Sequence, residues 1–200
     1  MNPDLLLALI GFAFVSSITP GPNNMMLLAS GVNFGMSLTV PHMMGVWLGF
    51  TLMLVIVGLG LGAAMLAVPV LHTALKLGSG GYLLWLAWSL ASSGSLGGSQ
   101  AGARPMRFIE AVLFQWINPK AWVMAVTAMA VYTLPEAMVA SVLLVSGLFG
   151  VINLPCIAVW VGFGVGLRGF LEDPFRLRVF NISMAVLLLL STMPLLLDVI

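Results

Sequence analysis

Long apolar stretches separated by short polar ones dominate the sequence. The apolar stretches cover residues 5–29, 38–68, 71–91, 108–132, 137–167 and 179–200. Each is near or above the roughly 20 residues that a helix needs to cross a bilayer. None shows the period of two that marks a barrel strand. The pattern predicts an all-α polytopic membrane protein, with six transmembrane helices in a single domain over residues 1–200.

Composition supports a membrane protein. Hydrophobic residues make up 61% of the chain and charged residues 6%, with a mean hydropathy of +1.15, whereas about a quarter of the residues are charged in an ordinary soluble domain. The net charge of +1, without any basic tract, gives no indication of nucleic-acid binding. The single cysteine, Cys156, excludes an intrachain disulfide and is typical of a small buried hydrophobe.

A polar stretch rich in glycine and serine, residues 92–107, divides the chain into two halves of three spans, 1–91 and 108–200. Each half begins with a span that prolines interrupt, continues with an over-long span that carries closely spaced glycines, and ends with a shorter span. Because three is odd, the second half is expected to lie upside down relative to the first. This layout predicts an inverted repeat, which recurs in secondary transporters.

The distribution of basic residues predicts the orientation. One side of the membrane would carry five arginines, and the other would carry Lys76. The five are Arg104, Arg107, Arg168, Arg176 and Arg178. Since Lys and Arg are enriched in cytoplasmic loops, the linker is expected in the cytoplasm and both termini in the periplasm.

The first span is interrupted by "SSITPGPNN", residues 16–24. Proline cannot continue a helix but suits the first helical position. We therefore expect one half-helix to end near Thr19 and another to begin at Pro22, with Asn23 and Asn24 in its first turn. The free N–H groups and positive dipole end of that second half-helix would favour a carboxylate.

The fourth span is interrupted in the same way by "QWINPKAW", residues 115–122. Asn118 suits an N-cap and Pro119 the first helical position. Lys120 would lie about 12 residues into the span, roughly 18 Å deep. A lysine at that depth costs several kcal/mol unless it is paired or hydrated. It would serve as a counter-charge for a substrate carboxylate or as a group whose protonation is coupled to transport; the alternative is a lysine paired to helix-end carbonyls or to Glu110.

Together the two breaks form the predicted substrate site. Its residues are Thr19, Pro20, Gly21, Pro22, Asn23, Asn24, Gln115, Asn118, Pro119 and Lys120. The alternative is a pair of proline kinks held by hydrogen bonds between helices. Two kinks at matching places of a repeat favour a binding site. No cofactor and no metal is expected.

Three more polar residues are candidates for coupling or gating, each with a structural alternative. His42 follows Pro41 in the second span, where a hydrogen-bonded interfacial histidine is the preferred interpretation. Glu110 is expected to form an ion pair with Arg107. Asn153, close to Pro155, marks either a gate or a bend.

Glycine pairs and tryptophans suggest packing and membrane-interface roles. The pairs Gly45/Gly49, Gly58/Gly62 and Gly162/Gly166 have the GxxxG spacing of close helix packing, within a protomer or in a homodimer. Trp85, Trp88 and Trp160 lie at or near span ends and are interpreted as interface anchors.

The paired motifs, "TPGPN" after a first apolar run and "NPK" in the fourth span, resemble the LysE/RhtB family of bacterial amino-acid exporters over essentially the whole chain. "TPGPNN" and "FQWINPKAWVMAVTAM", with Gln115, look most like its cysteine/O-acetylserine exporter branch. Two departures are a loop after Gly35 without basic residues and Ala111 in place of a frequent glycine. The resemblance implies efflux of small amino acids, of cysteine/O-acetylserine or homoserine/threonine type, across the inner membrane, driven by the proton motive force.

Two competing classes are weaker. An intramembrane hydrolase would have to use Ser16 or Ser17 with His42, yet neither G-x-S-x-G nor H-E-x-x-H occurs in the sequence. A non-transporting assembly subunit would explain the glycine pairs but not a lysine in mid-membrane beside a capped helix break. The sequence therefore favours a transporter that works by alternating access.

Overall fold

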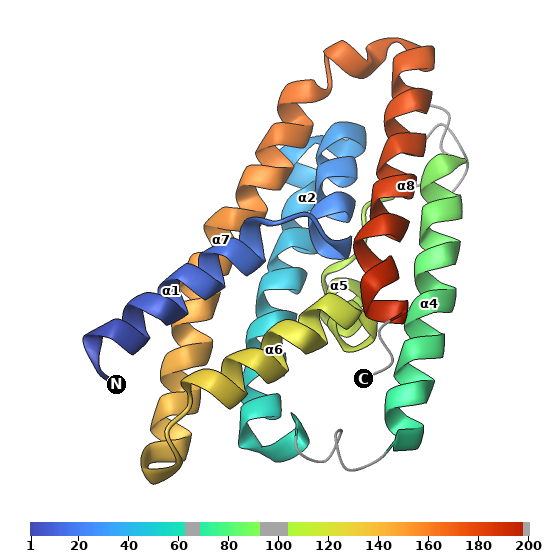
Figure 1. Ribbon diagram of the computed structural model, residues 1–200. Helices are drawn as coiled ribbons and strands as arrows, with labels where there is room; N and C mark the ends of the chain where they lie inside the picture. Colours follow the sequence, from blue (N-terminus) through green and yellow to red (C-terminus); the bar gives the residue numbers. More distant parts are fainter. Residues whose placement is uncertain (63–68, 93–103, 198–200) are drawn as a thin grey trace.

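The computed structural model describes residues 1–62, 69–92 and 104–197. Within these ranges every regular element is helical and no strand occurs, which confirms the all-α prediction. The helices are α1 (Pro3–Ile18), α2 (Pro22–Ile56), the π-helical turn η1 (Val57–Leu61), α4 (Pro69–Ala91), α5 (Phe108–Phe114), η2 (Gln115–Ile117), α6 (Pro119–Tyr132), η3 (Pro135–Ala137), α7 (Met138–Leu167), η4 (Phe170–Glu172) and α8 (Pro174–Leu197), as Figure 1 shows.

Two helical stretches in the described part, Pro22–Leu61 and Pro135–Leu167, are long and apolar enough to cross a membrane. The first is not one straight helix, because Gly35 has φ 78° and ψ 178°. Positive φ is a conformation that glycine adopts without steric cost. The Oγ of Ser30 lies 2.9 Å from the Oγ1 of Thr39, although nine residues of a straight helix would span about 13 Å. The chain thus turns at Gly35, where the sequence predicted the first loop.

The two parts of α2, residues 22–34 and 36–56, consequently lie side by side (Figure 1). The first predicted span corresponds to α1 plus residues 22–34, and the fourth to α5, η2 and α6. Both are interrupted at the residues expected, so the N-terminal ends of two inner half-helices lie within the helical bundle.

Helices far apart in the sequence pack against each other in antiparallel pairs (Figure 1). Residues 36–56 of α2 run beside α7, and α4 runs beside α8. Glycines permit the closest approaches: a Cβ on Gly31 would lie 2.5 Å from the carbonyl oxygen of Val161 on α7. Gly45 and Gly49 contact α5 in the same way, so this GxxxG pair packs within the protomer.

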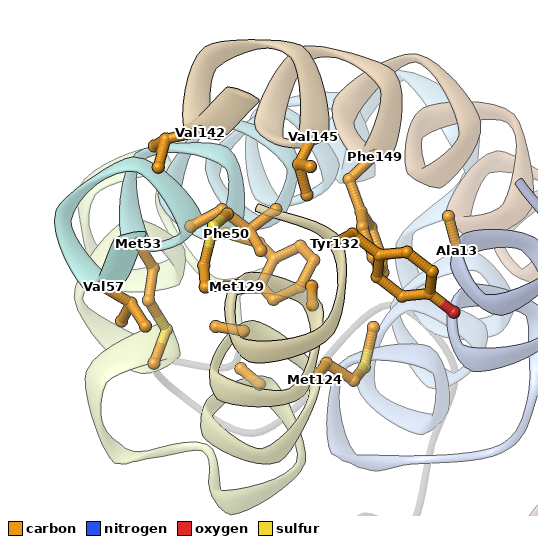
Figure 2. Close-up of a cluster of buried hydrophobic side chains, with 14 of the residues drawn as sticks. Ala13, Phe50, Met53, Val57, Met124, Met129, Tyr132, Val142, Val145 and Phe149 are labelled. Carbon is orange, nitrogen blue, oxygen red and sulfur yellow. The ribbon is translucent and has the colours of Figure 1, made fainter. Parts of the chain in front are cut away.

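An apolar core joins α1, α2, α6 and α7 directly beside the breaks. Figure 2 shows the rings of Phe50, Tyr132 and Phe149 among the methionines of this cluster. Phe50 and Phe149 pack edge to face, with ring centroids 5.5 Å apart. Since Phe50 and Met124 belong both to this core and to the cavity described below, the core supports the site from one side.

The last helix begins earlier than predicted. α8 begins at Pro174, not near Val179, so Arg176 and Arg178 lie in its first two turns instead of in a loop. The reason is local: the Oδ1 of Asp173 accepts a hydrogen bond from the Arg176 amide at 2.9 Å and caps the helix.

Most of the predicted linker and the side chain of Lys76 lie outside the described residues.

Candidate functional site

The first break comprises the three residues between α1 and α2, Thr19 to Gly21. Because prolines lack an amide hydrogen, the last carbonyls of α1 need other donors. The Nδ2 of Asn24 donates to the carbonyls of Ser17 and Thr19, both at 2.8 Å. The Nε1 of Trp160, on α7, donates to the carbonyl of Ile18 at 3.1 Å. Together with Lys120, described next, the side chains of Asn24 and Trp160 thus supply the donors for the last carbonyls of α1 and the break.

Lys120 joins the two breaks. Its Nζ donates to the Thr19 carbonyl at 2.9 Å, to the Thr19 Oγ1 at 3.0 Å and to the Pro20 carbonyl at 3.1 Å. An ammonium group has three N–H donors, so all three are used. The lysine therefore pairs with helix-end carbonyls, one of the two structural alternatives, and not with Glu110. The negative end of the α1 dipole also favours a cation there.

The second break is centred on Asn118. Its Oδ1 accepts the amide hydrogen of Lys120 at 3.1 Å, which confirms the predicted N-cap. The fully buried Gln115 exchanges two hydrogen bonds with Asn23 of the first break, at 2.8 and 3.2 Å. Gln115 also donates to the carbonyl of Ala111 at 2.9 Å. The structure therefore brings the residues predicted from both breaks into one place.

A small cavity of about 30 Å³ lies where the breaks meet, with room for about two water molecules. Its polar lining consists of Ser16, Ser17, Asn23, Asn24, Asn118, Lys120 and Asn153. Its other lining residues are Gly21, Phe50, Ala121, Met124 and Ile157. Within the described part of the chain, this lining holds one cation and no carboxylate.

Sequence reasoning had missed several of these residues. Ser16 and Ser17 were considered only as nucleophiles, and Phe50, Met124 and Ile157 were not singled out. Their only signal was their place in apolar helices, which core residues share. Trp160 was expected only as an interface anchor, and the hydrogen bond from its indole to the end of α1 was not foreseen.

Asn153 lies on α7, where the helix continues through Pro155. Its side chain is 6% exposed, and its Nδ2 donates to the Oγ of Ser17 at 3.1 Å. No other described residue provides a hydrogen bond to its Oδ1. Asn153 is thus part of the cavity wall itself.

His42 and Glu110 do not line the cavity. His42 is 2% exposed, and neither ring nitrogen has a hydrogen-bond partner among residues 1–62, 69–92 and 104–197. The expectation of a hydrogen-bonded interfacial histidine is therefore wrong.

Glu110 forms its ion pair with Arg104, at 2.5 and 2.8 Å, and not with the side chain of Arg107. Arg107 is the N-cap of α5, so its backbone amide donates to the carboxylate at 2.8 Å in a capping box. The hydrogen bonds that the exposed Arg104 guanidinium donates to the Glu110 carboxylate raise the pKa of Arg104. In the described ranges no three His, Cys, Asp or Glu side chains are grouped to hold a metal ion.

Comparison with known proteins agrees with the resemblance in the two motifs. The family model described as LysE type translocator matches residues 14–198. The cysteine/O-acetylserine efflux protein of Escherichia coli (strain K12) is 32% identical over 138 residues, which cover 68% of this chain and 69% of that protein. The protein of the same name from Salmonella typhimurium is 30% identical over 137 residues, with the same coverage. No solved structure gives a significant match. The chain therefore belongs to the LysE type translocator family, and is a membrane transporter and not an enzyme.

Proposed function

We propose that this protein exports small neutral amino acids from the bacterial cytoplasm across the inner membrane. The main observation behind this proposal is that the two helix breaks meet at Lys120. Its side chain, at the start of α6, hydrogen-bonds the Thr19 and Pro20 carbonyls just after α1. Relatives that carry the name cysteine/O-acetylserine efflux protein support this substrate class. A cavity with one cation and no carboxylate among its described lining residues disfavours lysine or arginine as substrate.

The proposed site holds the substrate carboxylate between Lys120 and the amino ends of α2 and α6. Helix amino termini and an ammonium both favour an anion. In the structure, Lys120 donates all its hydrogen bonds to Thr19 and Pro20, and the cavity has room for only about two water molecules. The substrate carboxylate must then compete with these carbonyls for the lysine. Binding would loosen the connection between the two halves.

This competition suggests how transport proceeds. We propose six spans in two inverted halves, with both termini periplasmic, and alternating access in which one half rocks against the other. The antiparallel pairing of α2 with α7 and of α4 with α8 is consistent with this arrangement. The proton motive force is the proposed energy source.

A homodimer is also part of the proposal, with Gly162 and Gly166 as its contact. An added Cβ on either glycine would meet no described atom within 4 Å, so both are open to a second protomer.

Efflux from proteoliposomes tests the proposal. Labelled cysteine, O-acetylserine, threonine and lysine would be followed with and without a pH gradient, in the wild type, Lys120→Met and Arg178→Gln. Arg178 is an exposed cation that does not line the cavity, and serves as the matched control.

We expect gradient-dependent efflux of the small neutral amino acids but not of lysine. It should fall at least tenfold in Lys120→Met and persist in Arg178→Gln. A folded wild-type protein that transports no amino acid would overturn the proposal and favour an assembly subunit. Full activity in Lys120→Met would show that transport does not depend on Lys120, and would overturn the proposed substrate site.

A further inference from the structure

Among the amides that line the cavity, Asn153 is the one whose side-chain oxygen is fully buried and has no hydrogen-bond partner in the described residues. The Oδ1 of Asn23 accepts from Gln115 at 3.2 Å, and the Oδ1 of Asn118 accepts from the Lys120 amide at 3.1 Å. The Oδ1 of Asn153 has no donor among the described residues, although the side chain is 94% buried, being 6% exposed. Buried polar atoms in proteins are nearly always hydrogen-bonded, so an unpaired one beside a cavity points to a ligand.

The orientation of this amide is fixed from the other side. The Nδ2 of Asn153 donates to the Oγ of Ser17 at 3.1 Å, and Ser17 lies in the last turn of α1. With the NH₂ group held by Ser17, the oxygen is the part of the amide that remains available. The carbonyl end of α1 adds a negative dipole end at this corner, which favours a cationic group.

The remaining lining residues indicate which part of a substrate lies here. Ile157 is one helical turn after Asn153 on α7, so the two side chains lie on the same face, and both line the cavity with Phe50 and Met124. These three apolar residues suit an uncharged side chain. Lys120 suits the carboxylate, which leaves the α-ammonium for the open acceptor.

On the proposed export function, we infer that the Oδ1 of Asn153 accepts a hydrogen bond from the α-ammonium of the transported amino acid. Ser17 acts as a positioning residue that holds the amide in the accepting orientation. The site thereby distinguishes amino acids from carboxylic acids of the same shape that lack the amine. No covalent step is involved.

A competition experiment tests this assignment. Efflux of labelled cysteine from proteoliposomes would be inhibited by unlabelled L-cysteine or by 3-mercaptopropionate, which is the same molecule without its amine. In the wild type we expect the amino acid to compete at least tenfold better. In Asn153→Leu this ratio should fall toward one, while the weaker affinity for 3-mercaptopropionate stays nearly constant.

Two further variants make the result decisive. Ser146→Ala is the matched control: Ser146 is also buried on α7 with no hydrogen-bond partner in the described part, but it does not line the cavity, so its ratio should equal that of the wild type. Asn153→Asp keeps acceptor oxygens in nearly the same volume and should retain the preference for L-cysteine over 3-mercaptopropionate. This variant tests the inference even if Asn153→Leu fails to fold. A wild-type ratio in a transporting Asn153→Leu, or loss of the preference in Asn153→Asp, would overturn the inference. If the proposed export function is wrong, the wild-type protein itself will show no efflux. This outcome is distinct from a failure of the role inferred for Asn153, which appears only in the variants.

Discussion

Asn23 and Gln115 hydrogen-bond each other twice, although 92 positions separate them in the chain. Asn23 directly follows the proline that begins α2, and it reaches the segment before the second break. Lys120 directly follows the proline that begins α6, and it reaches the first break at Thr19. The residue after the helix-starting proline in each half therefore contacts the break of the other half. The two breaks are connected in both directions.

The Asn23–Gln115 pair should stabilise the fold measurably. Gln115→Leu would leave the carboxamide of the partly buried Asn23 without its partner, and an unpaired buried group costs about 1–3 kcal/mol. We expect a loss of this size in the free energy of unfolding in detergent. Since the two residues share one interaction, the double variant Asn23→Leu/Gln115→Leu should lose less than the sum of the single variants. Additive losses would contradict a direct pairing.

Gly21 is required for the placement of Lys120. A Cβ at residue 21 would lie 2.5 Å from the Cδ and 3.0 Å from the Nζ of Lys120. In Gly21→Ala the lysine must move away from the Thr19 and Pro20 carbonyls. We expect efflux to fall about tenfold, which corresponds to roughly 1.4 kcal/mol.

Gly11→Ala is the control for this variant, because a Cβ on Gly11 of α1 meets no described atom within 4 Å. Its efflux should equal that of the wild type. Equal activity in both variants would show that the position of the lysine does not limit transport.

The places of the helix breaks were predictable because the cause is local. Pro20, Pro22 and Pro119 have no amide hydrogen and a fixed φ, which disfavour a helix interior and suit its first position. Proline alone does not cause a break, since α7 continues through Pro155. Asn118 as an N-cap follows from the same short-range chemistry. The lysine between the breaks was conspicuous for its charge alone.

The partners of these residues were not predictable, because they come from tertiary packing. Trp160 follows an apolar run like Trp85 and Trp88, and only the folded chain shows that its indole meets the open carbonyl of Ile18. The ion pair of Glu110 was assigned to Arg107 by helical spacing. The N-cap geometry instead directs the Arg107 backbone to that carboxylate and leaves the side-chain contact to Arg104.

Substitution of Gly45 in the second span should cost more stability than substitution of Gly162 on α7. A Cβ on Gly45 would collide with the carbonyl oxygen of Phe108 and lie 2.7 Å from the Cβ of Ala111 on α5. We expect Gly45→Ala to lower the free energy of unfolding by about 1–3 kcal/mol, as overpacking does. Gly162→Ala meets no described atom within 4 Å and should be neutral, or stabilising by about 0.5–1 kcal/mol. Thermal unfolding of both variants in the same detergent would decide, and equal losses would contradict the packing argument.

His42 should be replaceable by an apolar residue. Both ring nitrogens are buried with no partner among the described residues, and an unpaired buried polar group costs about 1–3 kcal/mol. His42→Leu removes this cost, so we expect unchanged or higher stability, efflux within about twofold of the wild type and the same dependence on the pH gradient.

Thr39→Val provides the contrast on the same segment of α2. Thr39 is equally buried, but its hydroxyl donates to the Gly35 carbonyl at 2.8 Å and meets the Ser30 hydroxyl at 2.9 Å. Its loss should therefore reduce stability by about 1 kcal/mol or more, although valine has the same shape. If His42→Leu instead folds but no longer responds to the pH gradient, His42 gains a partner in another conformation of the transport cycle and takes part in proton coupling.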